Sequence, residues 1–169
     1  MAGRPRQSHR TGIPLTALFF AAWTLLWDQL TKAWIRDGLP LHRSIPVWPS
    51  CFQITSVRNE GAAWGMWAGR PVGLAVFAIL VLVLLVVFRR RVLPRGPAGQ
   101  IVLGLLAGGI LGNVIDRLLF GCVTDYLDFY LGPHHWPVFN VADVAICSGV
   151  ILFFLFSHLE SRRAPPPSP

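Results

Sequence analysis

Apolar residues gather in four stretches, and each is long enough to cross the hydrocarbon core of a membrane, which takes about 20 residues of helix. The stretches run from Ile13 to Ile35, Val72 to Phe88, Gln100 to Phe120 and Phe139 to His158. The pattern therefore predicts an α-helical integral membrane protein with four transmembrane helices.

The first stretch resembles a secretory signal peptide because several arginines precede its apolar run, Leu15 to Trp27. That run ends in Asp28 and Gln29 rather than in the small residues of a cleavage site. We therefore expect a retained signal-anchor helix.

The segment between the first two helices, residues 37–70, is long and contains Pro40, Pro46 and Pro49. Phe52 to Thr55 alternates in the manner of a strand, and Asn59 to Gly61 has the composition of a turn. We expect a small extracytoplasmic β-element here. The tryptophans that flank it suit a membrane surface; they are Trp48, Trp64 and Trp67.

Composition agrees with a membrane protein, since 53% of the residues are hydrophobic and 14% are charged. The chain has room for one membrane domain, residues 1–160, followed by a Pro-rich tail, residues 161–169, that we expect to be disordered. Arginines at 4–10, 89–95 and 162–163 all fall on one side of four spans, which predicts that both termini are cytoplasmic. Topology and anionic membrane lipid explain the net charge of +7, so no nucleic-acid partner is expected.

Four aspartates crowd the outer ends of the last two predicted helices. They are Asp116, Asp125, Asp128 and Asp143. A carboxylate near hydrocarbon costs several kcal/mol unless it is paired, hydrated or neutralised, so this neighbourhood is a candidate site. Two carboxylates that share a proton can activate water and protonate a leaving amine, which permits peptide hydrolysis without a metal or another nucleophile. Spacing alone lets Asp116, Asp125 or Asp128 be the partner of Asp143.

Other polar residues lie at helical spacing near these acids. Asp28 and Lys32 stand at i and i+4, which predicts an ion pair at the outer end of the first helix, with a lipid or substrate headgroup as the alternative contact. Asn113, Asp116 and Arg117 share one helical face, either as an ion network or in the chemistry itself, and Arg117 is a candidate cation for holding Asp116 ionised.

The third predicted helix carries a stripe of small residues, Gly104, Gly108 and Gly112, which indicates close packing against another helix. The cysteines and histidines lack the spacing of metal ligands, so neither a metal nor another cofactor is expected. Cys51 and Cys122 are both expected on the outer side, which permits a disulfide but does not decide it.

Three other functions compete with a dyad peptidase. A Ser/Lys peptidase would use Lys32 with Ser44, Ser50 or Ser56, but Asp28 would keep that lysine charged. A transporter would be expected to show inverted repeats and acids at mid-membrane. A non-catalytic assembly factor would keep its function without the aspartates.

Five stretches together resemble the lipoprotein signal peptidases, the type II signal peptidases of bacteria. They are Asp28-Gln29-Leu30-Thr31-Lys32, Asn59-Glu60-Gly61-Ala62-Ala63-Trp64-Gly65, Gly108 to Arg117, Val123-Thr124-Asp125-Tyr126 and Phe139-Asn140-Val141-Ala142-Asp143. They occur in order and cover nearly the whole chain outside its tails. Trp64 stands where many members have Phe.

The resemblance implies an aspartyl endopeptidase of the bacterial inner membrane that cuts diacylglyceryl-modified prolipoproteins before the lipidated cysteine. It implies four helices, a β-cradle and a short surface helix, in a protein we expect to be a monomer that contacts membrane lipid. By position it assigns catalysis to Asp125 and Asp143 and leaves Asp128 structural. The supporting or substrate-binding residues are Asp28, Lys32, Asn59, Gly61, Asn113, Asp116, Arg117 and Asn140.

Overall fold

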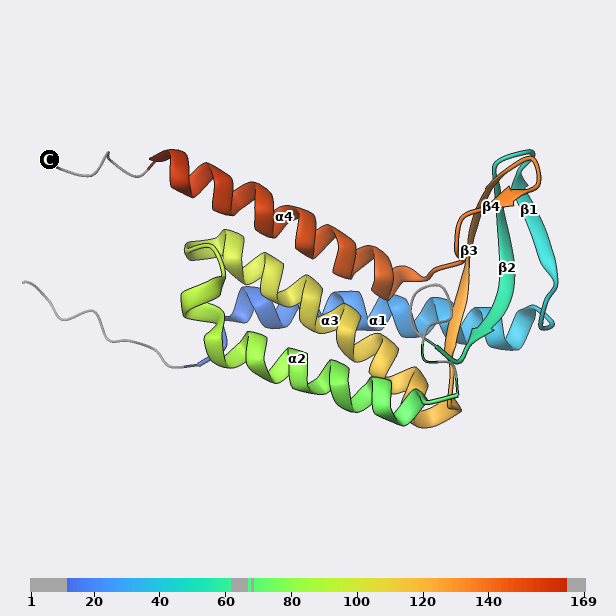
Figure 1. Ribbon diagram of the computed structural model, residues 1–169, viewed down its shortest axis with the longest axis horizontal. Helices are drawn as coiled ribbons and strands as arrows, with labels where there is room; N and C mark the ends of the chain where they lie inside the picture. The colour runs from blue at the N-terminus through green and yellow to red at the C-terminus, as the bar shows by residue number, and fades with distance from the viewer. Residues whose placement is uncertain (1–11, 62–66, 68, 164–169) are drawn as a thin grey trace, which may run out of the picture.

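A computed structural model describes residues 12–61, 67 and 69–163. Four long helices lie side by side, and a small sheet covers one end of them (Figure 1). Both described chain ends lie at the opposite end of the bundle. The elements in chain order are α1 (Leu15–Gly38), β1 (Ser44–Trp48), β2 (Phe52–Asn59), α2 (Pro71–Val92), α3 (Gly96–Phe120), β3 (Val123–Leu131), β4 (His134–His135) and α4 (Val141–Arg163).

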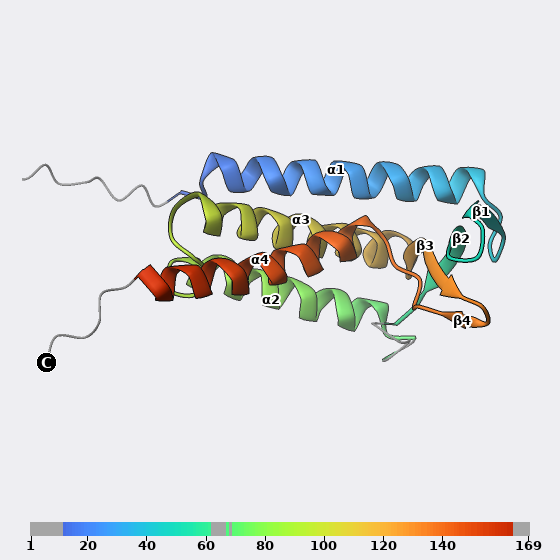
Figure 2. The ribbon, with the colours of Figure 1, turned by 90° about the horizontal axis from the view of Figure 1, so that it is seen from above.

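Helix α3 is the centre of the bundle and contacts α1, α2 and α4 (Figure 2). The glycine stripe on α3 explains why α1 can pack so closely against it. A Cβ atom on Gly108 would lie 2.7 Å from the Ala21 carbonyl oxygen and 2.7 Å from the Thr24 Cβ. Gly104 meets the backbone of α1 in the same way, and Gly112 meets the side chain of Asp28 on α1, so the predicted packing role of the stripe is confirmed.

Among the described residues, α2, α3 and α4 are long enough and apolar enough to cross a membrane. The first helix has 24 residues but does not meet that criterion. Its second half contains the charged residues Asp28, Lys32, Arg36 and Asp37, which lower its hydropathy. The four predicted helices are present, with α2 and α3 as antiparallel neighbours joined by the short turn at 93–95.

The sheet is antiparallel with strand order β1-β2-β3-β4. The predicted β-element within 37–70 is confirmed by β1 and β2. Asp125 and Asp128 lie between the third and fourth predicted helices, a segment that we interpret from the sequence as a plain connection. That interpretation is wrong, because the segment forms β3. A strand with one buried face alternates between apolar and polar residues. The first four residues of β3, Val123 to Tyr126, are all buried, so the sequence does not show this alternation.

The end of the last helix differs from the sequence-based expectation. Helix α4 continues to Arg163, so residues 161–163 are helical rather than part of the tail. The rest of the predicted tail, 164–169, and Trp64 lie outside the described residues. Within the described ranges no surface helix accompanies the four long ones, and all three cysteines are free thiols.

Candidate active site

Two carboxylates meet at the junction of the sheet and the bundle, Asp125 from β3 and Asp143 from the first turn of α4. Asn140 joins them. Its Nδ2 donates to Asp125 Oδ1 over 2.7 Å, and its Oδ1 accepts from the Asp143 backbone amide over 3.0 Å. Asp143 Oδ2 in turn accepts from the Asn140 backbone amide over 3.2 Å. This reciprocal cap explains why α4 begins here and fixes Asp143 at its third position.

The remaining carboxylate oxygens are held by two other amides. Asn59 Nδ2 donates to Asp125 Oδ2 over 3.0 Å, and Asn113 Nδ2 donates to Asp143 Oδ1 over 2.8 Å. The Gly61 backbone amide donates to Asn59 Oδ1 over 3.0 Å, which turns the Asn59 NH₂ group toward Asp125. Both acids are therefore oriented by asparagines whose own orientation is fixed.

Burial and the nearby charge of Asp143 raise the pKa of Asp125 to about 7, although hydrogen bonds from Asn59 and Asn140 oppose the shift. Only 3% of Asp125 is exposed. An acid with this pKa holds a proton for much of the time near neutral pH, as a general acid must.

A buried ion network lies behind the dyad. Lys32 Nζ lies 2.8 Å from Asp28 Oδ2 and 3.7 Å from Asp116 Oδ2, and all three side chains are 0% exposed. Lys32 also donates to Asn113 Oδ1 over 2.9 Å, so the NH₂ group of that asparagine faces Asp143. The predicted pair of Asp28 and Lys32 is confirmed, but its burial keeps it from lipid headgroups.

Each acid of this network accepts a hydrogen bond from the backbone amide of the residue that precedes one of the two dyad acids. Asp28 Oδ1 accepts a 2.9 Å hydrogen bond from the Ala142 amide, and Asp116 Oδ2 accepts one of 2.9 Å from the Thr124 amide. Ala142 precedes Asp143 and Thr124 precedes Asp125 in the sequence. The network on α1 and α3 thus positions the start of α4 and the start of β3.

Arg117 is not the cation beside Asp116, contrary to the sequence-based interpretation. The side chains of consecutive helical residues point in different directions, so Asp116 instead pairs with Lys32 and with Arg36 Nη1, the latter at 3.4 Å. Arg117 Nη2 donates to the Gly61 carbonyl oxygen over 3.0 Å. Its Nε is buried and has no hydrogen-bond partner among the described residues.

A cavity of about 510 Å³ opens beside the dyad. Its polar side is formed by Asn59, Asn113, Arg117, Asp125, Asp143 and Ser148. The rest is mostly apolar and comes from the segment before α4 and from the next turns of that helix. These residues are Trp136, Pro137, Val138, Phe139, Val144 and Ile151. Such a cavity suits an extended apolar peptide with its backbone at the carboxylates.

Asp128 lies away from this cavity. Its side chain is hydrogen-bonded within the sheet by Gln53, Thr55 and His135, at 2.7, 2.8 and 2.8 Å. Burial raises the pKa of Asp128, but these hydrogen bonds outweigh it and the pKa is lowered overall. A group held ionised in this way cannot share a proton with Asp143, in agreement with the structural role assigned to Asp128.

Sequence reasoning missed several contributors to the site. Arg36 follows Lys32 by four residues on α1, a spacing that placed it on the same face. Thr124 holds Asp116 through its backbone amide, which leaves no trace in the sequence. The cavity wall at 136–139 lacks secondary structure apart from a bridge between Phe139 and Leu127, so its position could not be read from periodicity.

Comparisons with known proteins show the family to which this chain belongs. Residues 20–159 match the model of the family described as signal peptidase II. The lipoprotein signal peptidase of Syntrophotalea carbinolica is 42% identical over 86% of this chain and 92% of its own length. That of Geobacter metallireducens is 41% identical over 84% and 90%.

A solved structure described as a bacterial membrane enzyme superposes with a TM-score of 0.80 at 33% identity, covering 91% of this chain and 93% of that one. A second structure with the same description gives a TM-score of 0.74 at 36% identity, covering 83% and 90%. Asp125 is buried and Asp143 is half-buried at one end of the helix bundle, and two neighbouring carboxylates are an arrangement that aspartic peptidases use. Together with the family match, this defines the class of the protein as an aspartic peptidase of the membrane. The chain belongs to the signal peptidase II family.

Proposed function

We propose that this protein removes the signal peptide from diacylglyceryl-modified prolipoproteins, cutting before the lipidated cysteine, with Asp125 and Asp143 as the catalytic pair. One observation carries the assignment of the pair: both carboxylates accept a hydrogen bond from Asn140, Asp125 from its side-chain amide and Asp143 from its backbone amide, and both acids line the cavity. The activity follows from membership of the family.

In the proposed reaction the dyad holds one proton and one water molecule. The ionised carboxylate removes a proton from the water while the water oxygen attacks the carbonyl carbon of the scissile peptide bond. The protonated carboxylate then gives its proton to the leaving nitrogen, and the C–N bond breaks. The pKa of about 7 for Asp125 favours this group as the proton carrier.

Arg117 is proposed to hold the substrate backbone. Its buried Nε has no acceptor among the described residues, while Nη2 is engaged by Gly61. Arg117 also lines the cavity, so an extended peptide bound there would bring a backbone carbonyl oxygen to its guanidinium group.

We propose that α1 is a fourth membrane span. Its charged residues Asp28 and Lys32 are fully buried against α3, whereas its outward residues Phe19, Leu26 and Leu30 are apolar and at least half exposed. Its 24 residues span about 36 Å at 1.5 Å per residue, enough for a hydrocarbon core.

The orientation in the membrane and the oligomeric state are also proposed from the arrangement of the residues. Arginines concentrate at the end of the bundle that carries both described chain ends, so this end is proposed to be cytoplasmic and the dyad to lie near the outer face of the inner membrane. The substrate's acyl chains would then remain in the bilayer. The dyad and its supports all come from one chain, which supports a monomer that works in contact with membrane lipid.

The test is cleavage of a diacylglyceryl-modified precursor by purified protein in detergent. Asp125→Asn and Asp143→Asn should each lower the cleavage rate by at least about a hundredfold, because each removes a group that transfers a proton. Asp37→Asn is the matched control, since Asp37 is an exposed acid at the end of α1. Normal cleavage by either dyad variant would refute the assignment, whereas a wild-type protein that cleaves nothing would refute the activity.

The rival functions have less support. The hydrogen-bond and ion-pair partners of Lys32 are Asn113, Asp28 and Asp116, so it is held charged by two acids and is unsuited to act as the base of a Ser/Lys peptidase. A non-catalytic assembly factor would not need a carboxylate pair beside a peptide-sized cavity, and its function would persist after the dyad replacements. A transporter would be expected to carry its acids at mid-membrane, whereas Asp125 and Asp143 lie at one end of the bundle.

A further inference from the structure

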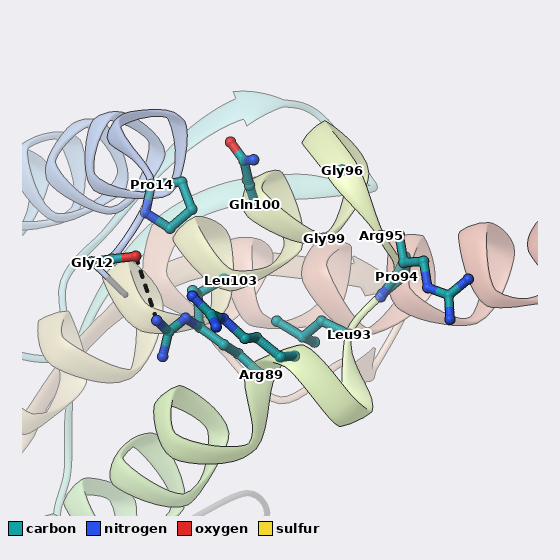
Figure 3. Close-up of a pocket in the computed structure, with 11 residues that line it drawn as sticks. Gly12, Pro14, Arg89, Leu93, Pro94, Arg95, Gly96, Gly99, Gln100 and Leu103 are labelled. Atoms are coloured by element: carbon teal, nitrogen blue, oxygen red, sulfur yellow. Dashed lines mark hydrogen bonds between the residues drawn. The ribbon is translucent and has the colours of Figure 1, made fainter. Parts of the chain in front are cut away.

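The dyad is held entirely at the end of the bundle that carries the sheet. A cavity of about 270 Å³ at the other end lies between the end of α2, the turn at 93–95 and the start of α3 (Figure 3). Its lining includes neither a dyad residue nor any described residue that holds the dyad. Side chains that influence the dyad therefore lie around the dyad itself.

Tyr126 follows Asp125 on β3 and points the other way, because successive side chains of a strand point to opposite faces. Asp125 lines the cavity beside the dyad, whereas Tyr126 does not. Only 4% of Tyr126 is exposed, and its hydroxyl donates a 2.7 Å hydrogen bond to Thr31 Oγ1. Its side chain therefore connects the strand that carries Asp125 to α1.

The Thr31 hydroxyl is well placed to accept this hydrogen bond. Its Oγ1 lies 2.7 Å from the Trp27 carbonyl oxygen and 3.0 Å from that of Asp28, so its own proton is donated within α1. Its lone pairs then face the Tyr126 hydroxyl. A phenylalanine in place of Tyr126 would break this chain of hydrogen bonds and keep the ring.

Tyr126 is also tied to the start of α4. Its backbone amide donates to the Phe139 carbonyl oxygen over 3.0 Å, and the next residue, Asn140, joins the two acids of the dyad. Burial raises the pKa of the Tyr126 hydroxyl, while Thr31 and the backbone amide of Val141 oppose the rise. Since Val141 is the first residue of α4, the hydroxyl lies where β3, α1 and α4 meet.

We propose that Tyr126 is a positioning residue, whose hydrogen bond to Thr31 holds Asp125 in place. The residue on the other side of Asp125, Thr124, is held by Asp116 of α3. The strand is thus anchored on both sides of the acid, by α3 and by α1. Without the second anchor the carboxylate shifts from the amides that orient it. This inference rests on the proposed function of the dyad.

Tyr126→Phe should lower kcat for the lipidated precursor roughly tenfold, since small misplacements of a reacting group are costly. KM should stay nearly unchanged, because neither Tyr126 nor Thr31 lines the cavity. Tyr130→Phe is the matched control, as it removes the other tyrosine hydroxyl of the chain from the far end of the same strand. An unchanged kcat in Tyr126→Phe, a rise in KM alone or an equal loss in Tyr130→Phe would overturn the proposal.

Thr31→Val removes the acceptor of the same hydrogen bond and should lower kcat to the same extent. The double variant Tyr126→Phe/Thr31→Val should lose no more than either single variant, because both changes remove one interaction. Thr31→Ser restores the acceptor and should recover the kcat that Thr31→Val loses. Multiplied losses in the double variant would show that the two side chains act independently, and would overturn the proposal.

A measurement without substrate separates this proposal from the peptidase function. The infrared band of the protonated Asp125 carboxyl group, identified by its loss in Asp125→Asn, reports its pKa, about 7 in the wild type. Hydrogen bonds from Asn59 and Asn140 lower that pKa, so their weakening in Tyr126→Phe should raise it.

The charged side chains that act on Asp125, among them Asp143, Lys32 and Arg117, are unchanged in these variants, so a shift reports its hydrogen bonds. Titration of Asp125 at the wild-type pH in Tyr126→Phe would overturn the positioning role, even in a protein that cleaves nothing. A raised pKa in a protein whose wild type cleaves no precursor would support the positioning role and refute the peptidase function alone.

Discussion

The carboxylate of Asp28 accepts a 2.9 Å hydrogen bond from the backbone amide of Ala142, so a charge on the first helix holds the first turn of the last one. That carboxylate is fully buried and depends on Lys32 for its counter-charge. The residue next to Ala142 is Asp143, and the stability of this ion pair is therefore coupled to the geometry of the dyad.

Lys32→Met should destabilise the protein strongly, by about 3–5 kcal/mol, because it leaves Asp28 as a buried charge without a cation. Thermal unfolding in detergent measures the effect. The double variant Asp28→Asn/Lys32→Met should recover part of the loss, since no unpaired charge remains. An unchanged unfolding temperature in Lys32→Met would contradict the proposed contribution of the ion network to stability.

Cleavage should decline as the pH rises through about 7, because the dyad then loses the proton that the leaving nitrogen needs. Stability should follow the same direction. The folded protein keeps a proton on Asp125 that the unfolded chain releases near its ordinary pKa of 3.8, so stability falls between about pH 4 and pH 7. Unfolding temperatures across this range should slope downward in wild type and less so in Asp125→Asn; equal slopes would count against the raised pKa.

Gly108→Ala should destabilise the bundle by about 1–3 kcal/mol, because the added methyl group meets the backbone of Ala21 and the Thr24 side chain. Gly73→Ala is the matched control on α2, where a Cβ meets nothing within 4 Å. It should stabilise by about 0.5–1 kcal/mol through helix propensity. Chemical denaturation in mixed micelles compares the two, and similar effects would show that the glycine stripe does not set the distance between α1 and α3.

Asp128→Asn should raise KM several-fold and leave kcat nearly unchanged. Asp128 ties β4 to the sheet through His135, and the next residue, Trp136, begins the cavity wall. Loss of the charged acceptor should also cost about 1–3 kcal/mol of stability. Steady-state cleavage kinetics separate the two constants, with His135→Gln as the companion variant. A collapse of kcat like that expected for Asp125→Asn would instead place Asp128 in the chemistry.

The positions of the four helices could largely be predicted, because a long run of apolar residues is nearly sufficient to identify a membrane helix. The pairing of Asp28 with Lys32 followed from their i, i+4 spacing, and the glycine stripe indicated a close helix contact. These features are local in the sequence, so periodicity reveals them.

The rest depends on contacts between distant segments. Strand β3 was missed because it is buried at its start and carries two acids, and its pairing with β2 brings Asp125 opposite Val57. The cation beside Asp116 was assigned to its neighbour Arg117, whereas the fold supplies Lys32 and Arg36 from another helix. Which acid faces Asp143 is likewise decided by the placement of β3 against the start of α4, which no spacing along the chain encodes.

Both described chain ends lie at the far end of the bundle from the dyad (Figure 1). From Asp143 to the end of α4 at Arg163 the helix rises roughly 30 Å. A fluorescent or affinity partner fused after the last helix would therefore stand a full membrane thickness away from the cavity. Such fusions offer a way to purify, image or tether this peptidase while the end of the bundle that carries the sheet stays open to substrate and inhibitors.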